Sequence, residues 1–314
     1  MKAVVYDKRN STNTLVYQEV EKPIPNDNEV LVKIFASSIN AADYRSMKMG
    51  IIPKQKIFGA DIAGRIEALG KNTNKFRIGE EVLGDISNFG FGGFAEYVAV
   101  PESALVLKPA NVSFVTAAAI PMAAVTALQA LRDKGNVQPG HKILICGAGG
   151  GVGTFAVQLA KHFGAEVSAV CGGENVKVVQ SLGADHVVNY NKDDFTKGSK
   201  LYDLVLAVNG NHTISVYKRM LALKGVFVLV GGALTQVVKT MLFGTFMSMG
   251  SRKMRFLAAK PNVKDLEYII KLVEDGKVKP VIDRCYPIHE TAEAVQYLSK
   301  GHAKGKVVIN VQND

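Results

Sequence analysis

The sequence predicts an α/β protein in which a doubly wound parallel sheet is joined to a second, β-rich domain. Between residues 120 and 260, apolar runs such as KILIC (142–146) and VFVLVGG (226–232) alternate with helix-like segments. Runs without polar alternation are typical of strands buried on both faces of a parallel sheet. Before residue 119, short alternating strands are separated by turns rich in Gly, Asn and Asp, which indicates a barrel-like β domain.

The N-terminal region contributes the first set of expected elements. Strands are expected at residues 3–7, 29–37, 61–69, 81–86 and 95–100. After Pro261 the pattern changes again, to an amphipathic helix, a strand, a second helix and a last strand. These four elements are expected within residues 265–276, 281–288, 290–301 and 304–311. A chain of 314 residues is long enough for two domains of this kind.

Composition narrows the class of protein. The chain is 47% hydrophobic and 21% charged, as expected of a globular protein, and its start, MKAVVYD, reads as a strand rather than a targeting segment. The apolar stretch from Leu234 is short for a membrane span and contains Lys239. These features predict a cytoplasmic protein without a membrane segment.

The spacing of the cysteines and histidines and the distribution of charge argue against disulfide, metal and nucleic-acid-binding functions. The three cysteines form no CxxC pair and the six histidines show no HxxxH spacing, which argues against a disulfide framework and a metal site. The net charge of +10 suits an anionic partner, either a nucleic acid or a small polyanion. Because the lysines are spread along the chain and tryptophan is absent, we do not expect nucleic-acid binding.

A glycine run, Gly147–Gly153, carries the first functional signal. It lies between the apolar strand at 142–146 and an amphipathic helical pattern, whereas a flexible linker would have polar flanks. In a strand–turn–helix unit, glycines let the backbone approach a pyrophosphate held at the helix N-terminus. Gly147, Gly150 and Gly153 give G-x-x-G-x-x-G rather than the usual G-x-G-x-x-G. We predict dinucleotide binding; the alternative is a purely structural turn.

The end of the second strand of this domain indicates which dinucleotide binds. NAD-binding domains place a carboxylate there, but this chain has Cys171, followed by Gly172. A 2′-phosphate would meet no repulsion from that position, and Lys177 and Tyr190 are candidate partners for it. Glu174 argues in the opposite direction. The balance predicts NADPH, with NADH as the alternative.

Further motifs extend over nearly the whole chain. They are SSINAADY (37–44), FGADIAGRIEALGKNTNKFRIGEEV (58–82), GGFAEYVAVPE (92–102), IPMAAVTALQAL (120–131), the glycine run, SLGADHVVNYNKDDF (181–195) and residues 276–309. With these motifs the chain resembles the zinc-independent quinone oxidoreductases of the medium-chain dehydrogenase/reductase superfamily, near the alkenal reductases. The resemblance implies a GroES-like domain from residues 1–119 and 261–314 around a Rossmann domain at 120–260.

The resemblance also bears on metal and chemistry. At the positions where zinc-dependent relatives bind the catalytic zinc, this chain has Asn40, Ala60 followed by Asp61, and Met122. Metal-free transfer of hydride to quinones or α,β-unsaturated carbonyls is therefore expected. The implied catalytic residues are Asn40, Asp43 and Tyr44. Asn40 would bind a carbonyl and Tyr44 would donate to an oxyanion, whereas Asn40 and Asp43 could instead form a turn-capping pair.

The expected cofactor contacts are Thr126, Gly147, Gly150, Gly151, Val152, Gly153, Gly172, Lys177, Tyr190, Val230, Gly231 and Lys306. For Thr126 the alternative is a bond to its own helix, and for Lys304 and Lys306 it is a solvated loop. Residues 241–249, rich in Met, are expected to form a packed helix; the alternatives are a rim for apolar substrates or a dimer contact. The expected partners are a small quinone or enone and a second copy of the chain. An NADPH-binding sensor or an RNA-binding, crystallin-like protein is the rival function.

Overall fold

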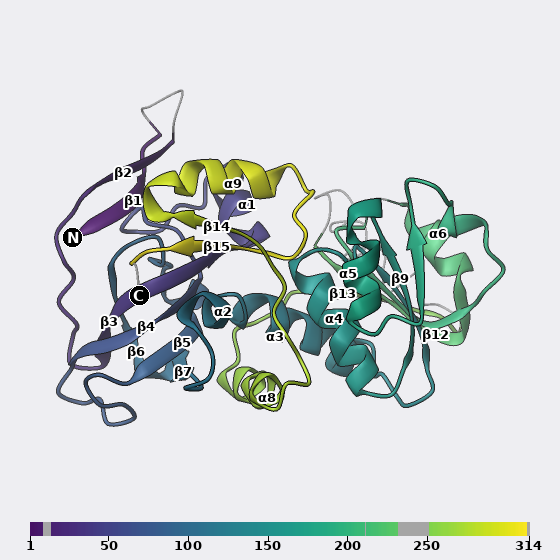
Figure 1. The fold of residues 1–314 in the computed structure, drawn as a ribbon, viewed down its shortest axis with the longest axis horizontal. Helices are drawn as coiled ribbons and strands as arrows, with labels where there is room; N and C mark the ends of the chain where they lie inside the picture. The colour runs from purple at the N-terminus through teal and green to yellow at the C-terminus, as the bar shows by residue number, and fades with distance from the viewer. Residues whose placement is uncertain (9–13, 211, 232–250, 313–314) are drawn as a thin grey trace. The chain divides into compact units, whose positions relative to one another are not determined.

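The computed structural model describes residues 1–8, 14–210, 212–231 and 251–312, so Gly232, Lys239 and the expected helix at 241–249 lie outside the described residues. The chain divides into two compact units. Unit 1 consists of Met1–Ala123, Pro261–Gly276 and Pro280–Asp314, and unit 2 of Ala124–Lys260 and Lys277–Lys279. Unit 1 thus contains both ends of the chain (Figure 1). The expected domain boundary after residue 119 lies close to this division.

Unit 1 is built on a seven-stranded sheet in the order β14-β15-β3-β4-β5-β7, with β6 paired to β3. Its strands are β3 (Glu29–Ile39), β4 (Asp61–Leu69), β5 (Glu81–Asp85), β6 (Tyr97–Pro101), β7 (Leu105–Leu107), β14 (Ile282–Pro287) and β15 (Lys306–Asn310). A separate hairpin pairs β1 (Lys2–Tyr6) with β2 (Leu15–Glu19). The β-rich first region is confirmed, and β2 and β7 are additions that the sequence pattern did not predict.

The core of unit 1 follows the two-residue period of its strands. Val30, Val32 and Ile34 alternate along β3 and are buried in one cluster with residues of β4. A second cluster contains Phe58 and Phe94, and it includes Val307 from β15. The side chains of the N-terminal and C-terminal segments therefore share one core.

The C-terminal segments complete the sheet of unit 1. Strand β15 pairs antiparallel with β3, with Val308 opposite Ser38, and parallel with β14. Helix α9 (Thr291–Ser299) lies beside the β1–β2 hairpin and α1 (Ala41–Met49), as Figure 1 shows. Unit 1 also contains α2 (Phe114–Ala118) and α8 (Val263–Glu274). The helices and strands expected after Pro261 are all present.

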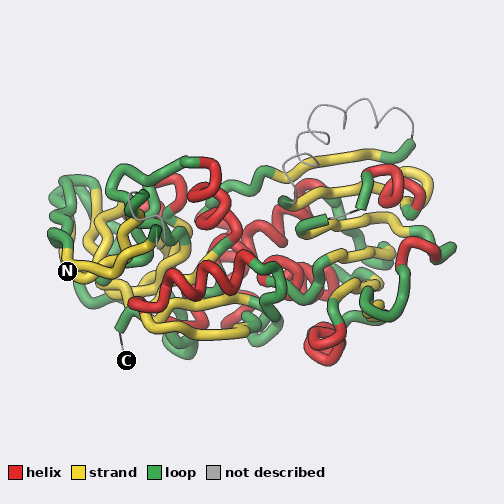
Figure 2. The backbone as a smooth tube through the Cα atoms, turned by 90° about the horizontal axis from the view of Figure 1, so that it is seen from above, coloured by secondary structure: helices red, strands yellow, loops and turns green. Residues whose placement is uncertain are grey.

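Unit 2 contains a six-stranded, wholly parallel sheet in the order β10-β9-β8-β11-β12-β13. The strands, which run side by side in Figure 2, are β8 (Lys142–Cys146), β9 (Glu166–Cys171), β10 (His186–Asn189), β11 (Tyr202–Val208), β12 (Leu221–Val230) and β13 (Lys253–Leu257). In chain order this is 3-2-1-4-5-6, the Rossmann arrangement, whose strand order reverses between β8 and β11. The predicted doubly wound sheet is confirmed.

Helices precede and connect the strands of unit 2. Those within the described residues include α3 (Pro121–Gln129, which begins in unit 1), a π-helical turn at Ala130–Lys134, α4 (Gly151–His162), α5 (Val176–Ser181) and α6 (Ile214–Arg219). Helix α4 packs against β8 and β9, and α5 packs against β9 and β10. Gly164 and Gly183 have φ of 77° and 97° just after α4 and α5, as expected of glycines that end helices. Among the described residues, no helix has the length and apolar character that a membrane crossing requires.

Candidate cofactor and active site

The glycine run forms the turn between β8 and α4. Gly147 has a φ of 81°, a left-handed conformation that favours glycine, and Gly150 precedes the first residue of the helix, Gly151. The first N–H groups of a helix have no acceptor within the helix and attract anions. The turn therefore presents the amides of Gly151, Val152 and Gly153 in the way that a dinucleotide-binding unit requires.

The glycines differ in what a side chain would meet. A Cβ at Gly153 would lie 2.1 Å from the Gly147 carbonyl oxygen and 2.7 Å from the Ala148 Cα, so the helix start is packed against the turn. A Cβ at Gly150 would meet nothing closer than 3.7 Å. Gly153 thus closes the turn, whereas Gly150 leaves open space above it. This cradle fits a pyrophosphate.

Two predicted partners of a 2′-phosphate lie around the end of β9. Tyr190 is 53% exposed, and its hydroxyl would lie 2.9 Å from a Cβ added at Gly172. Lys177 is exposed in the first turn of α5. Both side chains belong to segments that follow the carboxyl ends of neighbouring parallel strands, the edge at which such sheets bind ligands.

Asn175 is a polar residue near this edge that the sequence reasoning did not single out. Its Oδ1 is buried and has no hydrogen-bond partner in the described structure, and its side chain lies against Gly149 of the glycine run. An unpaired buried acceptor beside the cradle fits a ligand that brings a donor, such as a ribose hydroxyl. The residue lies between Glu174 and Lys177, but nothing in the sequence indicated that its side chain turns toward Gly149.

The other expected cofactor contacts also have defined places. Thr126 is buried in α3. Val230 is the last residue of β12, and Gly231 follows it with a φ of 66°. Because β8, β9 and β12 are parallel, the glycines that follow them, Gly147, Gly172 and Gly231, gather at one edge of the sheet.

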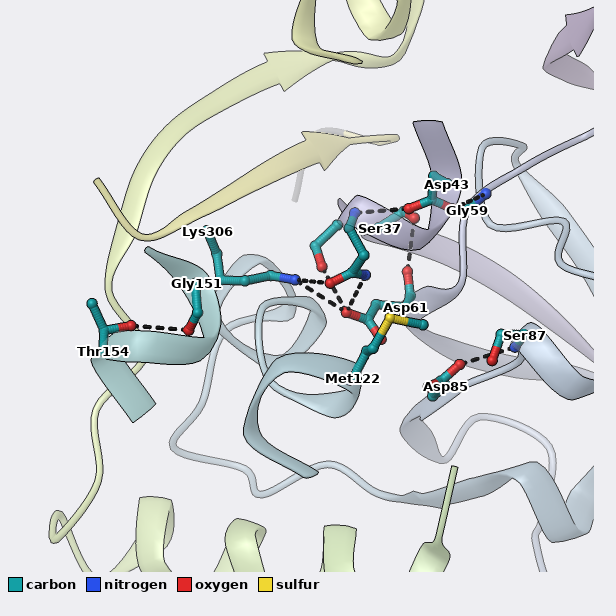
Figure 3. A network of polar contacts seen from close by, with 12 residues as sticks. Ser37, Asp43, Gly59, Asp61, Asp85, Ser87, Met122, Gly151, Thr154 and Lys306 are labelled. Atoms are coloured by element: carbon teal, nitrogen blue, oxygen red, sulfur yellow. Dashed lines mark hydrogen bonds and ion pairs between the residues drawn. The ribbon is translucent and has the colours of Figure 1, made fainter. Parts of the chain in front are cut away.

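Unit 1 contains a buried polar cluster around Asp61, at the start of β4 (Figure 3). Its Oδ1 accepts a hydrogen bond from the Met122 backbone N–H at 2.9 Å. Its Oδ2 accepts from Ser38 Oγ at 2.9 Å and from Asn40 Nδ2 at 2.8 Å. The Lys306 ammonium lies 3.3 Å from the same oxygen. Both oxygens of this fully buried carboxylate are therefore occupied by donors.

Asn40, the residue before α1, joins this cluster to the helix. Its backbone N–H donates to Asp43 Oδ2 at 2.7 Å, and the Gly59 N–H donates to Asp43 Oδ1 at 3.1 Å. Asp43 therefore has the capping role that was the alternative to catalysis. The Asn40 side chain does more than cap the helix, because its Nδ2 donates a hydrogen bond to Asp61.

Lys306, at the start of β15, requires a correction. It was expected either to meet a cofactor phosphate or to lie in a solvated loop. Its side chain is only 3% exposed, and its Nζ donates to Asn40 Oδ1 at 2.6 Å and to Asp61 Oδ2. A buried ammonium engaged by two acceptors of its own unit is a member of the Asp61 cluster, so the solvated loop is wrong for Lys306 and the phosphate contact is replaced by these two bonds.

The sheet register explains why these polar residues meet. Ser38 lies directly opposite Asp61 on the neighbouring strand, and Asp61 lies directly opposite Asp85. Directly opposed residues of antiparallel strands share one face of the sheet. Ser38, Asp61 and Asp85 therefore form one row across β3, β4 and β5.

Burial disfavours the charged form of two carboxylates in and beside this cluster, Asp43 and Asp85, and so raises their pKa values. Burial, followed by repulsion from the neighbouring Asp61, raises the pKa of Asp85 to about 7, while the Ser87 N–H donating at 2.9 Å opposes the shift. Burial likewise raises the pKa of Asp43 to about 7, against the two backbone N–H groups that it accepts. The cluster therefore takes up protons near neutral pH.

The raised pKa of Asp85 predicts a pH-dependent gain in stability for Asp85→Asn. The folded value of about 7 exceeds the ordinary 3.8, so the folded state holds a proton that the unfolded state has released, and stability is lost as pH rises through this window. The substituted carboxamide keeps an oxygen for the Ser87 N–H and carries no charge. In urea titrations we expect the variant to gain about 1–3 kcal/mol over wild type at pH 8, and less at pH 5. An equal difference at both pH values would contradict this assignment.

Tyr44, the third expected catalytic residue, is half-buried on α1. It packs against the hydrophobic cluster of Phe58 and Phe94. The Arg45 guanidinium lies 5.9 Å from its ring centre and the Lys48 ammonium 5.6 Å. The positive charge of these two side chains suits a Tyr44 hydroxyl that donates a hydrogen bond to a developing oxyanion.

Comparison with known proteins gives two family models that match the chain. They are described as an alcohol dehydrogenase GroES-like domain, over residues 26–110, and a zinc-binding dehydrogenase, over residues 182–309. A chloroplast envelope quinone oxidoreductase homolog of Arabidopsis thaliana is 34% identical, with 94% of this chain and 93% of that protein covered. An NADPH-dependent alkenal/one oxidoreductase of the same plant is 32% identical, with 98% and 79% covered. The quinone oxidoreductase structure from Coxiella burnetii superposes with a TM-score of 0.89 at 29% identity, with 99% of each chain covered.

Proposed function

This chain belongs to the medium-chain dehydrogenase/reductase superfamily, and from its relatedness to quinone and alkenal oxidoreductases we propose that it is an NADPH-dependent, metal-free reductase of quinones or α,β-unsaturated carbonyls. The observation that supports a metal-free mechanism is that the Asp61 carboxylate is already engaged by the protein. Both of its oxygens accept hydrogen bonds from the protein, and Lys306 lies beside one of them. A carboxylate that is engaged in this way and already has an ammonium beside it is a poor ligand for a second cation.

The neighbouring residues support the same proposal. Asn40, Ala60 and Met122 offer neither thiolate nor imidazole, the ligands that bind a catalytic zinc in the superfamily. No group of three or more His, Cys, Asp or Glu side chains within the described ranges is arranged to hold a metal ion. The three cysteines are free thiols, and burial raises the pKa of Cys146 to about 12.

The residues present suit an acceptor that is already electron-poor. A bound nicotinamide dinucleotide supplies a hydride. Hydride addition to a quinone or enone places negative charge on the acceptor oxygen, and fixed donors near that oxygen lower the barrier. In our proposal Asn40 and Tyr44 provide these donors, while the amides of the glycine run hold the dinucleotide.

NADPH preference rests on the end of β9. Cys171 stands where an acidic residue would select NAD, the Tyr190 hydroxyl lies close to the adjacent Gly172, and Lys177 is exposed in the first turn of the helix that follows. A Lys–phosphate contact is a charge-assisted bond, stronger than a neutral one. We expect Lys177→Ala to weaken NADPH binding about 10-fold and to leave NADH binding unchanged, in fluorescence titrations of both cofactors. Equal loss for both cofactors, or wild-type affinities that do not differ, would contradict the assignment.

The reaction itself is tested by mixing the protein with NADPH and phenanthrenequinone, and with a series of conjugated enones, in a stopped-flow spectrometer. The proposal requires loss of the NADPH absorbance with at least one acceptor. It also requires that dialysis against a chelator leave the rate unchanged. A protein that oxidises NADPH with none of these acceptors is not the enzyme proposed here.

Assembly and location remain predictions. A homodimer is supported by the family resemblance alone and is tested by light scattering on the purified protein. Some of the relatives are named as chloroplastic or mitochondrial, so the expected cytoplasmic location needs a direct test in cells.

A further inference from the structure

Lys306 is a buried cation beside a predicted substrate-binding residue. Its side chain is 3% exposed, and its Nζ donates to Asn40 Oδ1 at 2.6 Å. The partner that offsets its charge is Asp61, whose Oδ2 lies 3.3 Å from the same Nζ and also accepts from Asn40 Nδ2. Lysine, asparagine and aspartate therefore form a closed triangle of hydrogen bonds inside unit 1.

This triangle determines which way the Asn40 carboxamide faces. In the observed orientation its oxygen meets an ammonium and its nitrogen meets a carboxylate. The flipped amide would turn its oxygen toward Asp61 and its N–H groups toward Lys306, which places like partial charges together on both sides. The hydrogen-bond network thus assigns the amide orientation unambiguously.

The same triangle changes how strongly Asn40 donates. An amide nitrogen carries two N–H groups, and only one is needed for Asp61. A cation bound to the amide oxygen draws electron density from the nitrogen, and hydrogen bonds in series strengthen one another in a low-dielectric interior. Positive charge on Lys306 therefore makes the second N–H of Asn40 a better donor to an oxyanion than the same amide, bound to Asp61 alone, would be.

We propose that Lys306 is a positioning residue that acts through Asn40 and supplies the fixed positive charge which a metal ion supplies in zinc-dependent relatives. The inference rests on the proposed function, because it concerns the oxygen of a quinone or enone that gains charge as hydride adds to the acceptor. Lys306 neither touches the acceptor nor transfers a group. Asp61 in turn fixes the positions of the Lys306 and Asn40 side chains through its hydrogen bonds to both.

A double-mutant cycle tests whether Lys306 acts through Asn40. The observable is the rate of NADPH oxidation in single turnover, with saturating phenanthrenequinone. We expect about a 100-fold loss for Asn40→Ala and a loss of about 10-fold or more for Lys306→Met. The double variant should be at most about 3-fold slower than Asn40→Ala, because without the Asn40 amide the charge of Lys306 no longer affects the acceptor. Losses that multiply would overturn the proposal.

Lys108 provides a matched control. It is another lysine of unit 1 with a 3% exposed side chain, and it is paired with Glu81. Lys108→Met removes a buried ammonium of the same exposure without touching Asn40. We expect a stability loss on thermal melting but a wild-type rate per folded molecule. A rate loss equal to that of Lys306→Met would show that any buried lysine has this effect, and would contradict the specific role.

If Lys306→Met does not fold, Lys306→Gln takes its place in the cycle. The glutamine amide still donates to Asn40 Oδ1 and so keeps the orientation, but it carries no charge. The proposal then requires a rate between those of wild type and Asn40→Ala. A wild-type rate for Lys306→Gln would show that the charge is not needed.

Binding of 4-nitrophenol to the protein saturated with NADP⁺ supplies a readout that does not depend on turnover. Its phenolate mimics the charged oxygen of the reduced acceptor, and its absorbance reports ionisation. We expect the wild type to prefer the phenolate and Lys306→Met to bind it at least about 10-fold more weakly, with NADPH affinity unchanged. Lack of phenolate preference in an active wild type overturns the inference alone, whereas a wild type inactive with every acceptor overturns the proposed function.

Discussion

Replacing Gly153 with alanine is expected to abolish cofactor binding in the accessible concentration range and to weaken the fold of unit 2. The added Cβ would stand 2.1 Å from the Gly147 carbonyl oxygen and 2.7 Å from the Ala148 Cα, both of which are backbone atoms that cannot rotate away. The turn between β8 and α4 must open, at about 1–3 kcal/mol. Since the same turn presents the amides for the pyrophosphate, we expect the NADPH dissociation constant to rise at least about 100-fold.

Two other glycines of unit 2 separate these effects. Gly198 lies outside the helices and strands, and a Cβ there would meet nothing closer than 3.8 Å, so Gly198→Ala should match wild type in both stability and binding. Gly150→Ala meets no protein atom closer than 3.7 Å and should keep the fold. If its NADPH affinity falls, the open space above Gly150 is where the cofactor lies. A Gly153→Ala protein with wild-type affinity would refute the cradle.

Asp61→Asn is expected to have the largest effect on the stability of unit 1. The carboxylate accepts from four donors, and an amide would turn an NH₂ group toward at least one of them. It would also remove the negative charge that is in direct contact with the buried Lys306 ammonium. Removing one partner of a buried ion pair costs about 3–5 kcal/mol. Denaturant titrations at pH 7 should show this loss, together with loss of activity if the fold survives.

The contrast with Asp85→Asn makes this result specific. Both substitutions remove one negative charge from the same row of cross-strand neighbours, yet we expect opposite signs at pH 8. Asp85 accepts the Ser87 N–H, a neutral donor, whereas Asp61 is in direct contact with the Lys306 ammonium. If both variants were stabilised, repulsion among the carboxylates would outweigh the Asp61–Lys306 pair.

The parts of the molecule that are local in sequence were predictable. Rossmann strands are recognisable as apolar runs, and the turn at Gly147–Gly153 lies between its strand and its helix in one continuous segment. The short β7, only three residues long, escaped detection because three residues define no period. Position 61 was noticed, but only as the replacement for a zinc ligand.

The polar cluster was beyond the reach of sequence patterns because it is assembled by distant segments. Lys306 and Asn40 are 266 residues apart, and Lys306 and Asp61 are 245 apart. The register that sets Asp85 opposite Asp61 depends on how β4 and β5 pair, which an alternating pattern leaves open to any shift of two residues. A lysine in a glycine-containing stretch near the end of a chain resembles a surface residue, and only the pairing of β15 with β3 buries it.

The position of β15 between β14 and β3 also sets an order of events during synthesis. Strands β3, β4 and β5 leave the ribosome early, and the strands of unit 2 follow, before the chain returns to unit 1. Until residues 306–310 emerge, the edge of β3 that β15 covers is unpaired, and Asp61 lacks the Lys306 ammonium beside it. Unit 2 can acquire its sheet while the chain is still being translated, whereas the Asn40 site is completed only after residues 306–310 have emerged.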